Sequence, residues 1–214
     1  MLNKISNFIL RKKEIQEVIQ FSPPRTGSTL VWNALKLYVN DPHKTHLVKD
    51  VHELSKSLIV STIRNPFDMV CSSILRYERT FNEQSVQETI QMFESYNFNI
   101  LLSLTEKKNC LILKYESFYN NYDFLFNELN YFFKKNISTR EILSFKNEFS
   151  VNRVLEKVSH LKKFGNYNRE NLFHGKHIGP NNGAPNSYEK YLNEDMKNQI
   201  KKSFNDIFSY FEYN

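Results

Sequence analysis

Two patterns of hydrophobic positions alternate along the chain, one typical of buried strands and one of helices. Short continuous apolar runs predict strands buried on both faces of a parallel sheet, and they lie at residues 17–22, 44–48, 57–63 and 110–115. Apolar residues at helical spacing predict helices at residues 28–39, 67–81, 85–104, 121–135, 138–149, 150–161 and 193–211. Strands that alternate with helices predict an α/β fold with a central parallel sheet flanked by helices, in three layers.

One segment departs from both patterns. Residues 163–190 contain four of the chain's 5 glycines and show neither period. A long irregular segment within a compact fold is usually functional or disordered. The full length of 214 residues suits one compact domain and is short for two, so we expect a single domain over residues 1–214.

Composition and charge narrow the functional classes. The net charge of +6 suits an anionic partner, but the basic residues are scattered, which argues against nucleic acid as that partner. No apolar run reaches the roughly 18 residues of a membrane span, and the N-terminal apolar stretch is too short for a signal peptide. Cys71 and Cys110 lie in apolar runs and are expected to be free thiols. We therefore expect a cytoplasmic protein, and no His/Cys/Asp cluster has the spacing of a metal site.

The first chemical motif is the stretch PPRTGST at residues 23–29, called the first loop below, between a predicted strand and a predicted helix. A helix N-terminus offers unpaired N–H groups to an anion, and Gly27 allows a ligand to approach the backbone closely. Arg25, Ser28 and Thr29 add a charge and two hydroxyl donors. The ATP-binding motif G-x-x-x-x-G-K-[ST] is not present, because its first glycine and its lysine are missing. A plain turn capped by Thr26 or Ser28 is the alternative.

A second motif, RNPFDMVCS at residues 64–72, is called the second loop and follows the predicted strand 57–63. Arg64 stands at the end of that strand, and Ser72 lies two helical turns later, so both could reach one phosphate. Ligands of such folds bind at the carboxyl ends of the strands, where both loops are expected. The alternative is that Arg64 is a surface residue paired with Asp68 four positions on.

Together the two loops resemble those of the sulfotransferases that use 3′-phosphoadenosine 5′-phosphosulfate (PAPS). In that family P-[KR]-[ST]-G-[ST]-[ST] holds the 5′-phosphosulfate, and residues 24–29 match it throughout. An Arg followed eight residues later by Ser binds the 3′-phosphate, which corresponds to Arg64 and Ser72. The resemblance covers residues 17–190, most densely before 75. It implies a nucleotide-binding fold like that of P-loop proteins, PAPS as co-substrate and 3′-phosphoadenosine 5′-phosphate (PAP) as product.

The resemblance also implies roles for residues outside the two loops. The Lys-Thr-His at residues 44–46 makes His46 the general base, with Asp50, His52 and Glu53 as alternatives. Arg25 would stabilise charge on the leaving group. Tyr115, in LKYESF, would lie near the nucleotide. The family's Arg-Lys-Gly over the 3′-phosphate is absent, and Lys176 and His177 are its expected replacements.

These motifs lead to an expected reaction, namely sulfuryl transfer from PAPS to a hydroxyl or amine of an acceptor, without a metal. The acceptor is expected to contact residues 80–105 and 145–175, whose sequence does not identify it. Two other classes are weighed against this one. A kinase-like phosphoryl-transfer enzyme needs the lysine that the first loop lacks. A nucleotide- or anion-binding module without catalysis, including a family member that has lost transfer, needs only the same loops.

Overall fold

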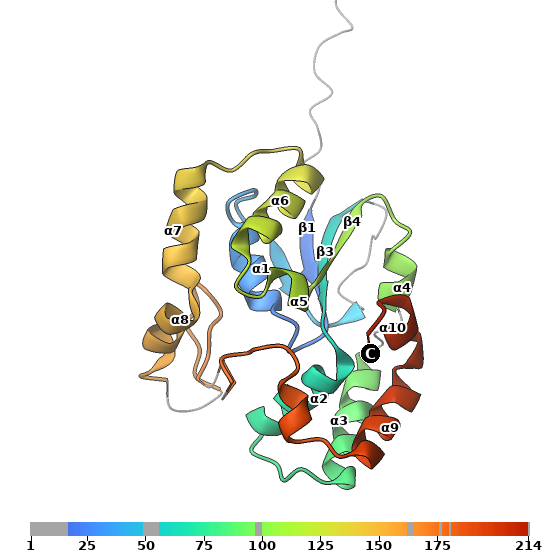
Figure 1. Ribbon diagram of the computed structural model, residues 1–214. Helices are drawn as coiled ribbons and strands as arrows, with labels where there is room; N and C mark the ends of the chain where they lie inside the picture. The colour runs from blue at the N-terminus through green and yellow to red at the C-terminus, as the bar shows by residue number, and fades with distance from the viewer. Residues whose placement is uncertain are drawn as a thin grey trace, which may run out of the picture.

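The computed structural model describes residues 17–48, 56–96, 100–161, 165–175, 177–179 and 181–213. Its centre is a parallel sheet of four strands: β1 (Val18–Phe21), β2 (His43–Thr45), β3 (Leu58–Ile63) and β4 (Cys110–Lys114). Their order across the sheet is β2-β1-β3-β4 (Figure 1). The predicted α/β class with a parallel sheet is confirmed.

Helices cover both faces of this sheet (Figure 1). Those in the described parts of the chain are α1 (Ser28–Leu35), α2 (Pro66–Arg76), α3 (Glu83–Ser95), α4 (Ile100–Leu104), α5 (Tyr115–Phe118), α6 (Tyr122–Phe133), α7 (Thr139–Phe149), α8 (Val151–Val158), the 3₁₀ helix η2 (Ser187–Lys190), α9 (Glu194–Ser203) and α10 (Asn205–Tyr210). None of the helices described is long and apolar enough to cross a bilayer.

The sheet separates two hydrophobic clusters, because successive side chains of a strand point to opposite faces. Ile19 and Ile59 join the cluster that α2, α3, α4, α9 and α10 complete. Their neighbours Val18 and Val60 join the other cluster, with residues of α1, α6 and α7. Both faces of each central strand are therefore buried, which explains why the strands appear in the sequence as continuous apolar runs.

Two predicted helices are each replaced by two shorter helices in the structure. The helix expected over residues 85–104 is divided into α3, whose C-cap is Tyr96, and α4. The helix expected over residues 193–211 is interrupted at Phe204, whose buried ring packs edge-on against Phe93 of α3. In both cases the apolar spacing continues across the interruption. A capping box formed by Ser138 and Glu141 begins α7.

The strand order places a functional crevice at one point of the sheet. From β1 the chain passes through α1 to β2 on one side, and β3 then pairs with the other side of β1. Ligands of open α/β sheets bind at the carboxyl ends of strands where the connections leave in opposite directions. The first loop follows β1 and the second loop follows β3, so both lie at this switch point.

Candidate active site

A cavity of about 450 Å³ opens at the carboxyl ends of β1 and β3. It is lined by the first loop, by Arg64 and Ser72 of the second loop, and by the late segment, the name used here for residues 165–190. Its basic lining residues are Arg25, Lys44, His46, Arg64, Arg76, His174 and His177. None of the described residues that line the cavity is acidic, so the cavity favours an anionic ligand.

The first loop is held in one conformation by contacts that only a glycine permits. Gly27 has a left-handed backbone (φ 80°), and a Cβ there would lie 2.8 Å from Cδ2 of Tyr115 and 2.9 Å from Cζ of Phe118. The Thr26 hydroxyl donates to the Pro23 carbonyl at 2.8 Å and contacts the Thr62 hydroxyl at 2.7 Å. These contacts hold the loop in the conformation described.

The first N–H groups of α1 are not capped by a side chain of any described residue. Gly27 is the N-cap, and within the described structure no side chain caps this helix and no acidic residue occupies its first turn. The alternative in which Thr26 or Ser28 caps this helix through its side chain is therefore wrong. Ser28 and Thr29 line the cavity beside these N–H groups. The geometry of such a helix N-terminus suits an anion.

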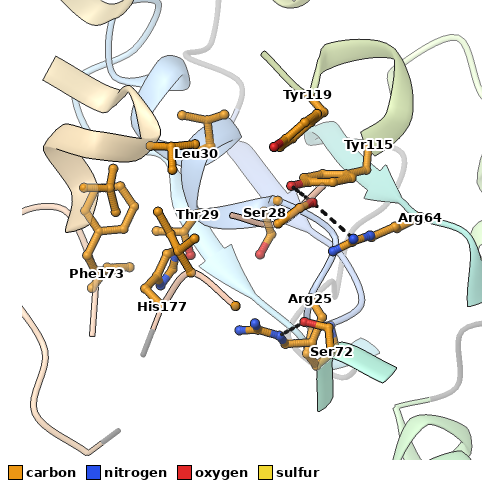
Figure 2. Close-up of a pocket in the computed structure, with 18 of the residues that line it drawn as sticks. Arg25, Ser28, Thr29, Leu30, Arg64, Ser72, Tyr115, Tyr119, Phe173 and His177 are labelled. Carbon is orange, nitrogen blue, oxygen red and sulfur yellow. Dashed lines mark hydrogen bonds between the residues drawn. The ribbon is translucent and has the colours of Figure 1, made fainter. Parts of the chain in front are cut away.

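Arg25 and Ser72 form a pair that the sequence did not predict. Nε of Arg25 donates to the Ser72 hydroxyl at 2.9 Å (Figure 2), whereas the sequence placed Ser72 with Arg64. Burial, followed by the charges of Arg76 and Arg64, lowers the pKa of Arg25 to about 9. Its guanidinium consequently keeps its charge at neutral pH.

Arg64 is buried at the end of β3 and is held from three sides. Its Nη2 donates to the carbonyls of Gly183 at 3.2 Å and Ala184 at 3.1 Å and lies 3.5 Å from the Asp68 carboxylate. The guanidinium also lies over the Tyr115 ring, 4.4 Å from its centroid. The pairing with Asp68 that the sequence allowed is therefore present, but in a buried site. Nε of Arg64 is buried and has no hydrogen-bond partner among the described residues.

Tyr115 joins the first loop to the late segment. Its hydroxyl donates to the Gly183 carbonyl at 2.8 Å, and its ring, together with that of Phe118, leaves no room for a Cβ at Gly27. Gly183 also has a left-handed backbone (φ 77°). Burial raises the pKa of Tyr115 to about 12, so the hydroxyl stays protonated and remains a donor.

The late segment is anchored to α2 by the buried carboxylate of Asp68. Its oxygens accept hydrogen bonds from the backbone N–H of Asn186 at 2.7 Å, the Ser187 hydroxyl at 3.1 Å and the backbone N–H of Tyr188 at 3.2 Å. The stretch without helix or strand periodicity thus forms a wall of the cavity, and hydrogen bonds to Asp68 hold its end in place.

His46 stands just beyond β2 with its tautomer fixed. Its Nδ1 lies 2.6 Å from the Ser22 carbonyl, which can only accept, so Nδ1 carries the hydrogen and Nε2 keeps a lone pair. Nζ of Lys44 lies 3.3 Å from that Nε2. Burial, and then the charge of Lys44, lowers the pKa of His46 to about 4, and burial lowers that of Lys44 to about 8. The alternatives Asp50, His52 and Glu53 lie outside the described residues.

His177 has different neighbours from those that the sequence suggested, and Lys176 lies outside the described residues. The His177 ring packs edge-on against Phe173, 4.7 Å between centroids, and its Nδ1 lies 3.2 Å from Nε2 of His174. In Figure 2, Phe173 and His177 lie on the far side of Thr29 from Arg64. Burial and the neighbouring His174 lower the pKa of His177 well below 6.5.

Several lining residues were missed by the sequence reasoning. Arg76 follows Ser72 by four positions on α2 and so lies one turn along the same helix face. This spacing from Ser72 could have predicted that Arg76 also lines the cavity. The cavity is also lined by a group of apolar side chains, namely Phe149, Val151, Val154, Leu172, Phe173 and Ile178, of which Phe149, Val154, Phe173 and Ile178 belong to one hydrophobic cluster. These residues come from the predicted acceptor range 145–175 and its immediate continuation. Across the described ranges, no three His, Cys, Asp or Glu side chains are grouped to hold a metal ion.

Comparison with known proteins supports the fold. No protein-family model and no curated protein sequence matches the chain. Mouse sulfotransferase SULT7A1 complexed with PAP matches with a TM-score of 0.69 at 13% identity, over 90% of this chain and 84% of that one.

Two complexes of retinol dehydratase match as well. The complex with androsterone and the inactive cofactor PAP gives a TM-score of 0.59 at 17% identity, covering 90% of this chain and 80% of that one. The complex with retinol and PAP gives 0.62 at 16% identity, covering 90% and 81%. The chain therefore has a sulfotransferase-like α/β fold, as the two loops predicted.

Proposed function

We propose that this protein is a sulfotransferase that moves the sulfuryl group of PAPS to a hydroxyl or amine of an acceptor. The observation that carries the proposal is that two separate sets of donors suited to anions line one cavity. The first is the start of α1 with Arg25, and the second is Arg64, whose buried Nε has no protein partner in the described structure. PAPS has an anionic group at each of its 5′ and 3′ positions, and the three structural neighbours above are complexes with PAP.

The residues present fit this nucleotide. The N–H groups at the start of α1, with Ser28 and Thr29, would hold the 5′-phosphosulfate, because an anion there also benefits from the helix dipole. Arg64 would bind the 3′-phosphate through a charge-assisted hydrogen bond. Tyr115 lies between these two places and would contact the nucleotide. Lys176 and His177 were expected at the 3′-phosphate, but the neighbours of His177 support a place near the acceptor.

Bound PAPS supplies an activated sulfuryl group, and the chain supplies charge and a base. The Arg25 guanidinium would stabilise negative charge on the leaving oxygen, and because it stays protonated it would act by its charge and not by donating a proton. Ser72 orients that side chain. Nε2 of His46 would take the proton of the acceptor hydroxyl in place of the hydrogen bond that it accepts from Lys44 in the free protein, and both residues line the cavity.

Titration with nucleotides tests the donor. We expect PAP to bind roughly 30-fold or more tightly than ATP. ATP has no 3′-phosphate and would leave the buried charge of Arg64 without an anionic ligand, which costs about 2 kcal/mol or more. Isothermal titration calorimetry without magnesium measures both affinities. ATP binding that equals or exceeds PAP binding, and that requires magnesium, would support the kinase-like alternative in place of this proposal.

The base is tested by substituting His46. His46→Ala should leave PAP affinity unchanged and lower kcat for sulfuryl transfer about 10²- to 10⁴-fold. Only the neutral imidazole can accept the proton, and its pKa is lowered from 6.5 to about 4. Activity of the unchanged protein should therefore stay level through neutral pH and decline only as the pH falls toward 4. If His46→Ala retains turnover, the base is Asp50, His52 or Glu53 instead.

A further inference from the structure

The chain that follows α10 packs back against the end of β4. Lys114, the last residue of β4, donates through its Nζ to the carbonyl of Phe211, a buried residue. The same ammonium lies 4.8 Å from the centroid of the Tyr213 ring. Residues 211–213, called the tail below, are therefore held beside the carboxyl end of the strand that precedes Tyr115.

A single carboxylate links this tail to the second loop. The Tyr213 hydroxyl donates to Oε2 of Glu116 at 3.0 Å, and Oε1 of Glu116 accepts the backbone N–H of Asn65 at 2.8 Å. Burial, followed by the charge of Glu116, raises the pKa of Tyr213, so its hydroxyl remains a donor. Residues 65, 116 and 213 are distant in sequence, and the carboxylate brings them into one hydrogen-bonded unit.

This unit fixes the position of Arg64 from two directions. Asn65 directly follows Arg64, and its side chain accepts the backbone N–H of Phe67 at 2.9 Å, so Asn65 is held at both its backbone and its side chain. Tyr115 directly precedes Glu116, and its ring supports the Arg64 guanidinium. Movement of Glu116 would therefore displace the backbone at Arg64 and the ring beneath its side chain together.

We propose that Tyr213 acts through Glu116 as a positioning residue for Arg64 and thereby sets the preference for nucleotides that carry a 3′-phosphate. The proposal rests on the proposed function, in which Arg64 binds that phosphate. Neither Tyr213 nor Glu116 lines the cavity. Their effect is consequently on the placement of the guanidinium and not on the rest of the nucleotide.

The test compares PAP with adenosine 5′-monophosphate (AMP), which lacks only the 3′-phosphate. Calorimetry should show that Tyr213→Phe, which removes one hydroxyl, weakens PAP binding about 5- to 10-fold, which is the size of effect expected for one typical net hydrogen bond. AMP affinity should change by less than about twofold, since Arg64 does not contact it. Tyr210→Phe is the matched control, because Tyr210 is an exposed tyrosine at the end of α10, and it should leave both affinities unchanged.

Two substitutions of Glu116 separate positioning from a general loss of structure. Glu116→Ala removes both hydrogen bonds and should reduce the ratio of PAP to AMP affinity further, whereas Glu116→Gln keeps an amide that can bond to both neighbours and should restore most of the ratio. Ratios unchanged in Tyr213→Phe and Glu116→Ala, or equal losses for PAP and AMP, overturn the positioning role. An unchanged protein that binds PAP no better than AMP overturns the proposed function itself.

Discussion

An Arg64→Ala variant is expected to bind PAP roughly 30-fold to several thousand-fold more weakly than the unchanged protein, with AMP affinity almost unaffected. Truncating one partner of a buried, hydrogen-bonded charge pair costs about 2–5 kcal/mol, and each 1.4 kcal/mol is a factor of ten. Arg64 is buried, rests on the Tyr115 ring and has an unused buried Nε, so little of its interaction with a phosphate would be lost to water. Calorimetry with PAP and AMP measures the effect.

The fold should survive this substitution, which makes the result interpretable. Asp68 loses its ion pair with Arg64 but keeps the hydrogen bonds from Asn186, Ser187 and Tyr188, so the late segment stays anchored. Arg64→Lys keeps the charge without the planar fork of donors and should give an intermediate PAP affinity. A thermal melt provides the control for stability. PAP affinity that is unchanged in a folded Arg64→Ala protein would place the 3′-phosphate elsewhere.

An Arg25→Ala variant should lose about 10²- to 10³-fold in kcat for sulfuryl transfer while PAP binding weakens much less. Removing one preorganised group that stabilises developing charge has an effect of that size. The start of α1 still provides N–H groups for the 5′ position, which is why affinity depends less on Arg25 than catalysis does. Release of PAP from radiolabelled PAPS measures kcat, and calorimetry measures binding.

The backbone of Arg25 offers a matched control. Its φ of 69° lies in the left-handed region, which costs a residue with a Cβ about 1–2 kcal/mol and glycine almost nothing. Arg25→Gly should therefore be more stable than Arg25→Ala to thermal unfolding, yet equally impaired in transfer. If the more stable Arg25→Gly variant also has a clearly higher kcat than Arg25→Ala, the loss of kcat reflects the loop conformation and not the missing guanidinium.

The sequence predicted the elements that depend on neighbours along the chain. Strand β1, the first loop and α1 follow one another within a few residues, so apolar runs, helical spacing and one glycine were sufficient to predict the strand, the loop and the helix start there. Arg64 was also placed correctly at a strand end. The sequence could not determine that Ser72 would meet Arg25, because that contact depends on how α2 lies relative to the first loop.

The remaining features depend on contacts between distant segments. The Asn65 to Glu116 hydrogen bond spans 51 residues, and the Arg64 to Gly183 bond spans 119. The late segment carries no period, so neither its path along the cavity nor the pairing of His174 with His177 could be anticipated. The predicted helix over 85–104 was too long for a related reason, since the apolar spacing reflects packing on the core and continues past the end of α3.

The bond between Tyr115 and Gly183 also bears on the order in which the protein acquires its cavity during synthesis. The first loop, Arg64 and Tyr115 emerge early, but the carbonyls that hold Arg64 and the Tyr115 hydroxyl belong to Gly183 and Ala184. Domains fold as the chain leaves the ribosome, N-terminal parts first. A nascent chain that ends before residue 184 therefore has its loops without the wall that closes over them, and the complete cavity forms only after translation has passed the late segment.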